Sequence, residues 1–125
     1  MKYLLDVNVL IACLFKPHPH HVRALTWAVE KKIVLCPITE LGFLRVITHK
    51  RAYALPMAGA RESLERFIAE SNAERIPDDM PALESRAEHS EQITDHYLAD
   101  LALRHGLKWA TLDEGLIHAA TELIR

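Results

Sequence analysis

Four acidic residues stand at positions where their carboxylates can act together: Asp6, Glu40, Asp95 and Asp113. Asp6 directly follows the apolar segment KYLL, Glu40 comes shortly after IVLCP, and Asp113 directly follows KWATL. If these segments are parallel strands, their carboxyl ends meet at one edge of a sheet, which is where open α/β sheets bind ligands. We therefore expect these three carboxylates to converge. The spacing alone leaves open the place of Asp95, in the first turn of an expected helix.

Clustered carboxylates repel one another and raise one another's pKa unless a cation lies between them. Mg²⁺ prefers oxygen ligands and is usually held by one or two carboxylates together with phosphate oxygens of the substrate. The pattern therefore predicts metal-assisted hydrolysis of a phosphodiester, in which the metal stabilises the charge that develops on the transferred group and on the leaving oxygen.

Most of the 17 aspartates and glutamates are expected to be ordinary solvated surface. Asp6 differs because it ends an apolar segment and lies near Asn8 in a stretch where an uncompensated charge is costly. Asp113 is in a similar position, with Thr111 as a candidate hydrogen-bond partner. Glu40 also has a purely structural explanation, because the helix dipole favours an acid in the first turn.

Two neighbouring acids are expected to lie outside the site. Asp100 follows Asp95 by five residues, which places it about 140° around the helix axis. Glu114 is adjacent to Asp113 and is expected to face solvent.

The apolar pattern predicts alternating strands and helices. Strands are expected at residues 2–5, 33–37, 73–77, 108–112 and 121–124. Helices are expected at residues 20–32, 39–50, 57–68, 80–92 and 95–105, and a turn followed by a short helix at residues 6–15 and 113–120. Thr39 and Thr94 are candidate N-caps, and Gly106 is a candidate helix-ending glycine. The fold class that follows is α/β, with a parallel sheet covered on both faces and a single domain over residues 1–125.

Composition indicates the class of protein and its expected location. Half the residues are hydrophobic and 26% are charged, which is ordinary for a globular protein. Cys13 and Cys36 stand inside apolar runs and are expected to be buried thiols. The apolar N-terminus is interrupted by Asp6 and Asn8 and is followed by no clear cleavage pattern, and no apolar run approaches the roughly 18 residues of a membrane span. We therefore expect a cytoplasmic protein without a membrane segment.

The charge pattern does not by itself indicate a nucleic-acid binder, since the formal net charge is −2. The densest basic cluster is His49, Lys50 and Arg51, with Arg45 shortly before it. A solvated helix end, favoured by the helix dipole, explains this cluster at least as well as a substrate contact does.

Four segments, taken in order, resemble the motif blocks of the PIN-domain ribonucleases, and most closely their VapC-type toxin branch: LLDVNVLIA, TELGFLRV, ITDHYLADLALRHG and WATLDEGL. The resemblance runs from Lys2 to about Leu116. It implies a three-layer α/β/α sandwich with a mostly parallel central sheet, Mg²⁺ or Mn²⁺ as cofactor, and single-stranded or structured RNA as substrate.

The same resemblance assigns roles to residues. The acidic metal ligands of the family fall on Asp6, Glu40, Asp95 and Asp113, and its supporting polar positions fall on Asn8 and Thr111. It also implies a small DNA-binding antitoxin, whose tail inserts into the active-site groove, and a homodimer.

Several other features have more than one reading. The stretch with His18, His20 and His21 is expected to be a surface loop rather than a transition-metal site. Trp27 and Trp109 are expected in the core or an interface. The segment 41–47 has apolar residues on more than one face, so it is either fully buried or part of a subunit contact.

Two other function classes remain open. A haloacid-dehalogenase-like phosphotransferase uses an aspartate such as Asp6 as nucleophile, but it needs a second acid where Asn8 stands and a lysine near the same sheet edge, whereas Lys108 is at the other end of its strand. A non-catalytic module that binds RNA or protein is the second class. Four clustered acids count against it, because RNA binding gains from basic charge.

Overall fold

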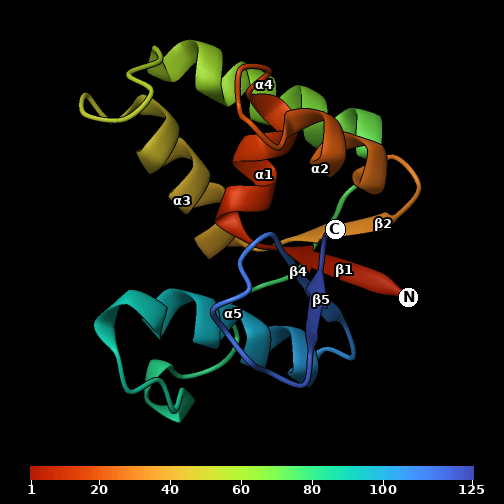
Figure 1. The fold of residues 1–125 in the computed structure, drawn as a ribbon, viewed down its shortest axis with the longest axis vertical. Coiled ribbons are helices and arrows are strands. Elements are labelled where there is room, and N and C mark those ends of the chain that lie inside the picture. The colour runs from red at the N-terminus through yellow and green to blue at the C-terminus, as the bar shows by residue number, and fades with distance from the viewer.

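The structure is a computed structural model that describes residues 1–125. Its centre is a five-stranded sheet in the order β3-β2-β1-β4-β5, and every neighbouring pair is parallel (Figure 1). The strands are β1 (Lys2–Leu5), β2 (Lys32–Leu35), β3 (Glu74–Arg75), β4 (Lys108–Thr111) and β5 (Thr121–Leu123). The predicted parallel sheet is confirmed, including its two short outer strands.

Helices cover both faces of the sheet. One layer holds α1 (Val7–Leu14), α2 (His21–Ala28), α3 (Pro37–Thr48) and α4 (Met57–Ser71). The opposite layer holds α5 (Ile93–Arg104), preceded by the short 3-10 helices η1 (Ala82–Glu84) and η2 (Ser90–Gln92) (Figure 1). The predicted three-layer α/β/α sandwich is therefore confirmed.

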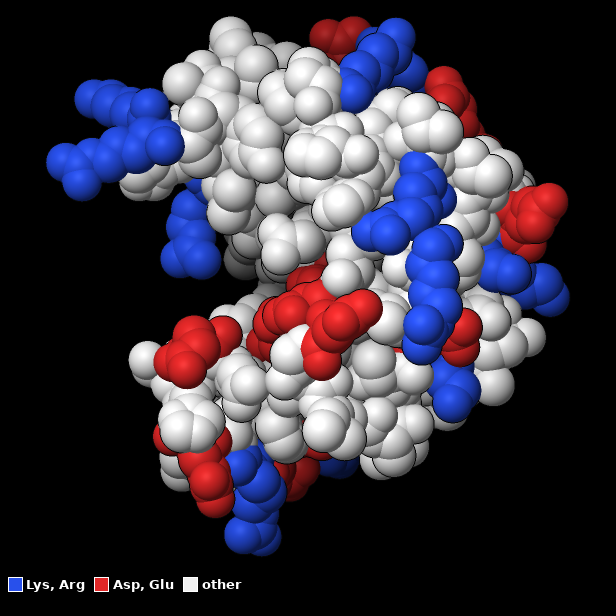
Figure 2. All heavy atoms as spheres, viewed as in Figure 1, with Lys and Arg blue, Asp and Glu red and all other residues white.

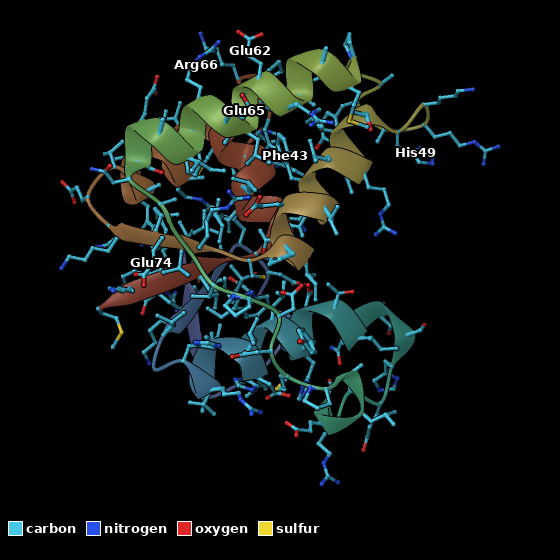
Figure 3. All side chains as sticks on the ribbon, turned by 180° about the vertical axis from the view of Figure 1, so that it is seen from behind. Phe43, His49, Glu62, Glu65, Arg66 and Glu74 are labelled. Carbon is cyan, nitrogen blue, oxygen red and sulfur yellow. The ribbon has the colours of Figure 1, made fainter.

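The three central strands, β2, β1 and β4, carry successive buried apolar residues because neighbouring side chains enter two different cores. In β1, Leu5 packs with the four-helix layer and Leu4 packs with α5. In β4, Ala110 packs with the four-helix layer and Trp109 packs with α5. Figure 3 shows Phe43 on the inner side of α3, where it belongs to the core of the four-helix layer.

Two expected helices are wrong. Residues 80–92 form only η1 and η2, because Met80 is the only buried side chain in the segment and a helix there has no apolar face to pack. Residues 113–120 form turns instead of a helix. There the side chains of Asp113 and His118 accept hydrogen bonds from the backbone N–H groups of Gly115 and Ala120, which compete with helical bonding.

Some boundaries also differ from the expectation. The first residue of α3 is Pro37, whose fixed φ suits that position, so Thr39 is not a cap. The N-cap of α5 is Gln92 rather than Thr94. The end of α5 is as predicted, because Gly106 has a φ of 70° there.

Exposed apolar residues mark both α2 and α3, and those of α3 correct an expectation. On α2 the buried residues are Ala24 and Ala28, while Val22 and Val29 are 75% and 72% exposed. On α3 the buried apolar residues lie on one face only, and Leu41 is 65% exposed, so this helix is not fully buried.

Other expectations hold. Both cysteine thiols are free and buried, and Trp109 is fully buried. Burial raises the pKa of Cys13 to about 12 and that of Cys36 to about 11, so neither thiol is a reactive thiolate. None of the helices combines the length and the apolar character needed to cross a membrane.

Candidate metal centre

A cavity of about 390 Å³ lies at the carboxyl edge of the sheet, between α1, α3 and α5. Asp6, Asn8 and Asp95 line it, together with Gly42 and Arg45 of α3. Figure 2 shows the corresponding notch in the molecular surface, with acidic side chains gathered on its floor. The structure thus brings Asp95, whose place the sequence spacing left open, into the same cavity as Asp6.

Asp6 is the buried centre of this arrangement. It follows β1 directly, its backbone N–H donates to the Ala110 carbonyl at 3.0 Å, and the residue is only 2% exposed. Burial, with a further contribution from the charge of Asp95, raises the pKa of Asp6 to about 7. Hydrogen bonds from Thr111 and from the backbone of Val7 and Asn8 oppose this rise without cancelling it.

Thr111 connects two of the acids. Its hydroxyl donates to Asp6 Oδ2 at 3.0 Å and accepts the backbone N–H of Asp113, also at 3.0 Å. The hydroxyl therefore acts both as a donor and as an acceptor. Thr111 itself is fully buried, at the end of β4. The candidate role of Thr111 as a supporting polar residue has a clear structural basis in this bridge.

Asp95 and Asp113 extend the acidic cluster toward solvent. Asp95 stands in the first turn of α5, and partial burial together with the charge of Asp113 raises its pKa. Asp113 lies on the exposed side, and its Oδ1 accepts the backbone N–H of Gly115 at 2.8 Å. Asp6, Asp95 and Asp113 thus form one electrostatically connected series of carboxylates.

Glu40 is oriented differently from the other three acids. It stands in the first turn of α3, but its carboxylate forms a two-point ion pair with the guanidinium of Arg75 at the end of β3. The Nε–Oε2 distance is 2.9 Å. Neither Glu40 nor Asp113 lines the cavity of Asp6 and Asp95, but Asp113 is connected to that cavity through Thr111 and through its charge on Asp95. Sequence reasoning missed Arg75, although its signal was a basic residue at the same carboxyl edge as the acids.

A separate cluster joins α5 to the segment before β5. Asp100 accepts hydrogen bonds from His96 Nδ1 at 3.1 Å and from His118 Nε2 at 2.7 Å. Because His118 Nδ1 accepts the Ala120 N–H, the ring carries its proton on Nε2 and has no free nitrogen for a metal. We interpret the cluster as a tether for the segment that carries Asp113. The i, i+4 spacing of His96 and Asp100 was visible in the sequence, whereas the contribution of His118 was not.

Comparison with known protein families shows to which family this chain belongs. The model of the PIN domain family matches residues 3–122. The chain belongs to the PIN domain family. Two curated PIN-domain relatives from Mycobacterium tuberculosis are "Ribonuclease VapC38", 33% identical with 95% of this chain and 90% of the relative covered, and "Ribonuclease VapC29", 36% identical with 94% and 90% covered. The recognition of a VapC-type PIN domain from its four sequence blocks is therefore confirmed.

Solved structures give the same PIN-domain fold. The structure of VapBC2 from Rickettsia felis bound to a DNA fragment from their promoter superposes with a TM-score of 0.65 at 16% identity, over 98% of this chain and 97% of that chain. DNA-bound VapBC from Salmonella typhimurium gives a TM-score of 0.63 at 20% identity, over 98% and 96%. At these identities the likeness concerns the fold.

Proposed function

We propose that this chain is a metal-dependent endoribonuclease that hydrolyses RNA phosphodiester bonds. The observation that carries the proposal is the buried carboxylate of Asp6, which shares a cavity with Asp95 and has its pKa raised to about 7. The naming of the relatives as ribonucleases supports the reaction class.

The residues of the cavity fit a hard divalent cation. Their donors are carboxylate oxygens and the side chain of Asn8, and Mg²⁺ and Mn²⁺ prefer oxygen ligands. Burial, with a smaller contribution from a neighbouring carboxylate, raises the pKa of both Asp6 and Asp95, and a divalent cation between them would favour their charged forms. We assign Asp6, Asp95 and Asp113 as the residues that would hold Mg²⁺ or Mn²⁺, with Glu40 joining them after release from Arg75.

Each residue has a distinct task in this proposal. Asp6 provides the buried charge, and Thr111 fixes the orientation of its carboxylate. Asp95 and Asp113 would help Asp6 to hold the metal, and Asn8 and Arg45 line the cavity in which a scissile phosphate would lie. A bound divalent ion would supply Lewis-acid stabilisation of the charge that develops on that phosphate.

The experiment is cleavage of a labelled single-stranded RNA in the presence of Mg²⁺, with sequencing of the RNA ends. We expect cleavage by the wild type and at least a hundredfold loss in Asp6→Asn and Asp113→Asn, on the order expected for loss of an electrostatic contact to the transition state. Glu114→Gln is the matched control, because this exposed acid is adjacent to Asp113 and should be silent. Undiminished cleavage by Asp6→Asn would refute the assignment.

We further propose that the ribonuclease is the cytoplasmic toxin of a toxin-antitoxin pair. The VapC names of its relatives and the VapBC titles of similar structures support a small DNA-binding antitoxin as partner. Expression in a bacterial host should arrest growth, Asp6→Asn should abolish the arrest, and co-expression of the antitoxin should relieve it. We also expect the protein to form a homodimer in solution. Its molecular mass from sedimentation tests this expectation.

The phosphotransferase alternative is disfavoured by the position of its lysine. Lys108 is the first residue of β4 and lies at the edge of the sheet opposite Asp6. The non-catalytic binding module becomes the favoured reading if purified protein binds RNA but does not cleave it with Mg²⁺ or Mn²⁺.

A further inference from the structure

A second groove, of about 780 Å³, lies between α3 and α4 at the loop that joins them. We call it the basic groove, after the four cations in its lining: Arg45, Lys50, Arg51 and Arg61. Figure 2 shows basic side chains on the upper lip of the notch, above its acidic floor, and Figure 3 shows His49, which also lines the groove, at the far end of α3.

The four cations are all exposed, and none forms an ion pair with an acidic side chain. No aspartate or glutamate lines the groove. Elsewhere Arg66 pairs with Glu62, Arg75 with Glu40 and Arg104 with Glu84, and the other unpaired arginines do not gather in one groove. Because the whole chain has a net charge of −2, this grouping of unpaired cations is a local feature.

The helix dipole explains the positions of only some of the four cations. A cation near the end of α3 has a structural reason to be there. Arg61 has no such reason, because it comes from the second turn of α4 and reaches the groove from the other side. The intervening loop is held in place by the His49 ring, whose Nδ1 accepts the Arg51 backbone N–H at 3.0 Å.

The basic groove adjoins the acidic cavity, since Leu41 and Arg45 line both. Its lining also includes exposed apolar surface, because Leu41 is 65% and Met57 is 49% exposed. A ligand that suits this lining carries regularly spaced negative charges together with apolar faces, as a nucleotide strand does with its phosphates and bases.

We propose that the basic groove binds the sugar-phosphate backbone of single-stranded RNA and leads it into the acidic cavity. The identity of the strand as RNA rests on the proposed function. An acidic peptide fits less well, because it has no flat bases to cover the exposed apolar lining of the groove, while both ligands bring negative charge toward Asp6 and Asp95. A phosphodiester meets the same acids through the divalent ion that they would hold.

Binding is tested separately from cleavage in an Asp6→Asn background, with a labelled 12-nucleotide single-stranded RNA of mixed sequence over a range of salt. Four phosphate contacts predict a slope of log K against log salt of about −3, since each contact to a single strand contributes about −0.7. Adding Lys50→Ala and Arg51→Ala should reduce the slope by about 1.4 and weaken binding at low salt by roughly tenfold.

The matched control is Lys32→Ala with Lys108→Ala, which removes the same charge from the first residues of β2 and β4, at the opposite edge of the sheet. Thermal melts establish that both pairs fold. The inference is overturned if the groove pair binds RNA like its parent, or if the control pair loses as much. It is also overturned if the groove pair loses binding to polyglutamate and keeps binding to RNA.

The experiment distinguishes failure of the groove assignment from failure of the ribonuclease proposal. If the wild type binds RNA through the groove but never cleaves it, the proposed function fails and the groove assignment stands. If the wild type cleaves RNA and the groove pair binds and cleaves like its parent, the groove assignment fails and the proposed function stands.

Discussion

The hydroxyl of Thr111 donates a hydrogen bond to Asp6 Oδ2 at 3.0 Å, and this contact ties the end of β4 to the end of β1. The two strands are neighbours in the sheet, with Leu5 opposite Ala110, so the residues that follow them are brought together by register. The same hydroxyl accepts the Asp113 backbone N–H. One buried side chain therefore fixes the relative positions of two candidate metal ligands.

Thr111→Val tests this bridge, because it keeps the shape and removes the hydroxyl. We expect a loss of about 1 to 3 kcal/mol in the free energy of unfolding, since Asp6 loses a buried donor and the Asp113 N–H loses its acceptor. Cleavage should fall as well. Thr111→Ser keeps the hydroxyl and should retain most of both properties in urea unfolding and cleavage assays. A larger loss in Thr111→Ser than in Thr111→Val would mean that packing by the methyl group, and not the hydrogen bond, matters.

Asp6→Asn should stabilise the metal-free protein at neutral pH. The pKa of Asp6 is about 7 in the folded chain and 3.8 in its ordinary environment, so between these values the folded state binds more protons than the unfolded state. Wild-type stability therefore falls as pH rises through this window, and above it the full penalty remains. A shift of about three units corresponds to at most about 4 kcal/mol.

Urea unfolding of wild type and Asp6→Asn in EDTA, from pH 4 to pH 8, measures this difference. The advantage of the variant should be small near pH 4 and largest above pH 7, and Glu114→Gln should show no such trend. Mg²⁺ should restore the wild type at pH 8 without affecting Asp6→Asn. A pH-independent difference between wild type and Asp6→Asn contradicts the raised pKa.

Arg75→Ala should lower the Mg²⁺ concentration needed for half-maximal cleavage by about three- to fivefold, because the ion pair with Glu40 must open before Glu40 can join the metal. Arg66→Ala is the matched control. It breaks the pair with Glu62 on the outer face of α4, far from the site (Figure 3). A higher Mg²⁺ requirement in Arg75→Ala would instead show that Arg75 positions Glu40 for binding.

Gly42→Ala should disturb the site through packing. A Cβ at Gly42 would lie 2.6 Å from Val7 Cγ2, so α3 and α1 would have to separate beside the acidic cavity. We expect a loss of about 1 to 3 kcal/mol and reduced cleavage. Gly59→Ala, on α4, meets nothing within 4 Å and should stabilise by up to about 1 kcal/mol. Thermal unfolding of both variants checks the contrast, and similar melting temperatures would contradict it.

The sequence predicted the sheet edge well. Apolar runs that end in an acid identify both the strand and the residue that follows it, which is why Asp6 and Asp113 could be proposed as site residues from position alone. The place of Asp95 depended on how α5 packs across the other face of the sheet, and no local pattern encodes that packing. It came from the resemblance to PIN domains, and the structure places it in the same cavity as Asp6.

Long-range pairs and irregular segments were not predicted. The pair of Glu40 with Arg75 and the tether of His118 to Asp100 join residues far apart in the chain. The helix expected at residues 80–92 failed because charge-rich sequence with good helix formers still needs a packed face. The lack of this helix does not affect the site, because α5 begins at Ile93 and carries Asp95 in its first turn.

The central claim is that Asp6, Asp95 and Asp113 hold one divalent metal centre, and Mn²⁺ binding followed by electron paramagnetic resonance tests it most directly. Wild type and the control Glu114→Gln should bind Mn²⁺ with the same affinity, and Mg²⁺ should compete. Asp6→Asn and Asp95→Asn should each weaken binding at least tenfold while remaining folded. Mn²⁺ affinity in both variants equal to that of the wild type would contradict the claim.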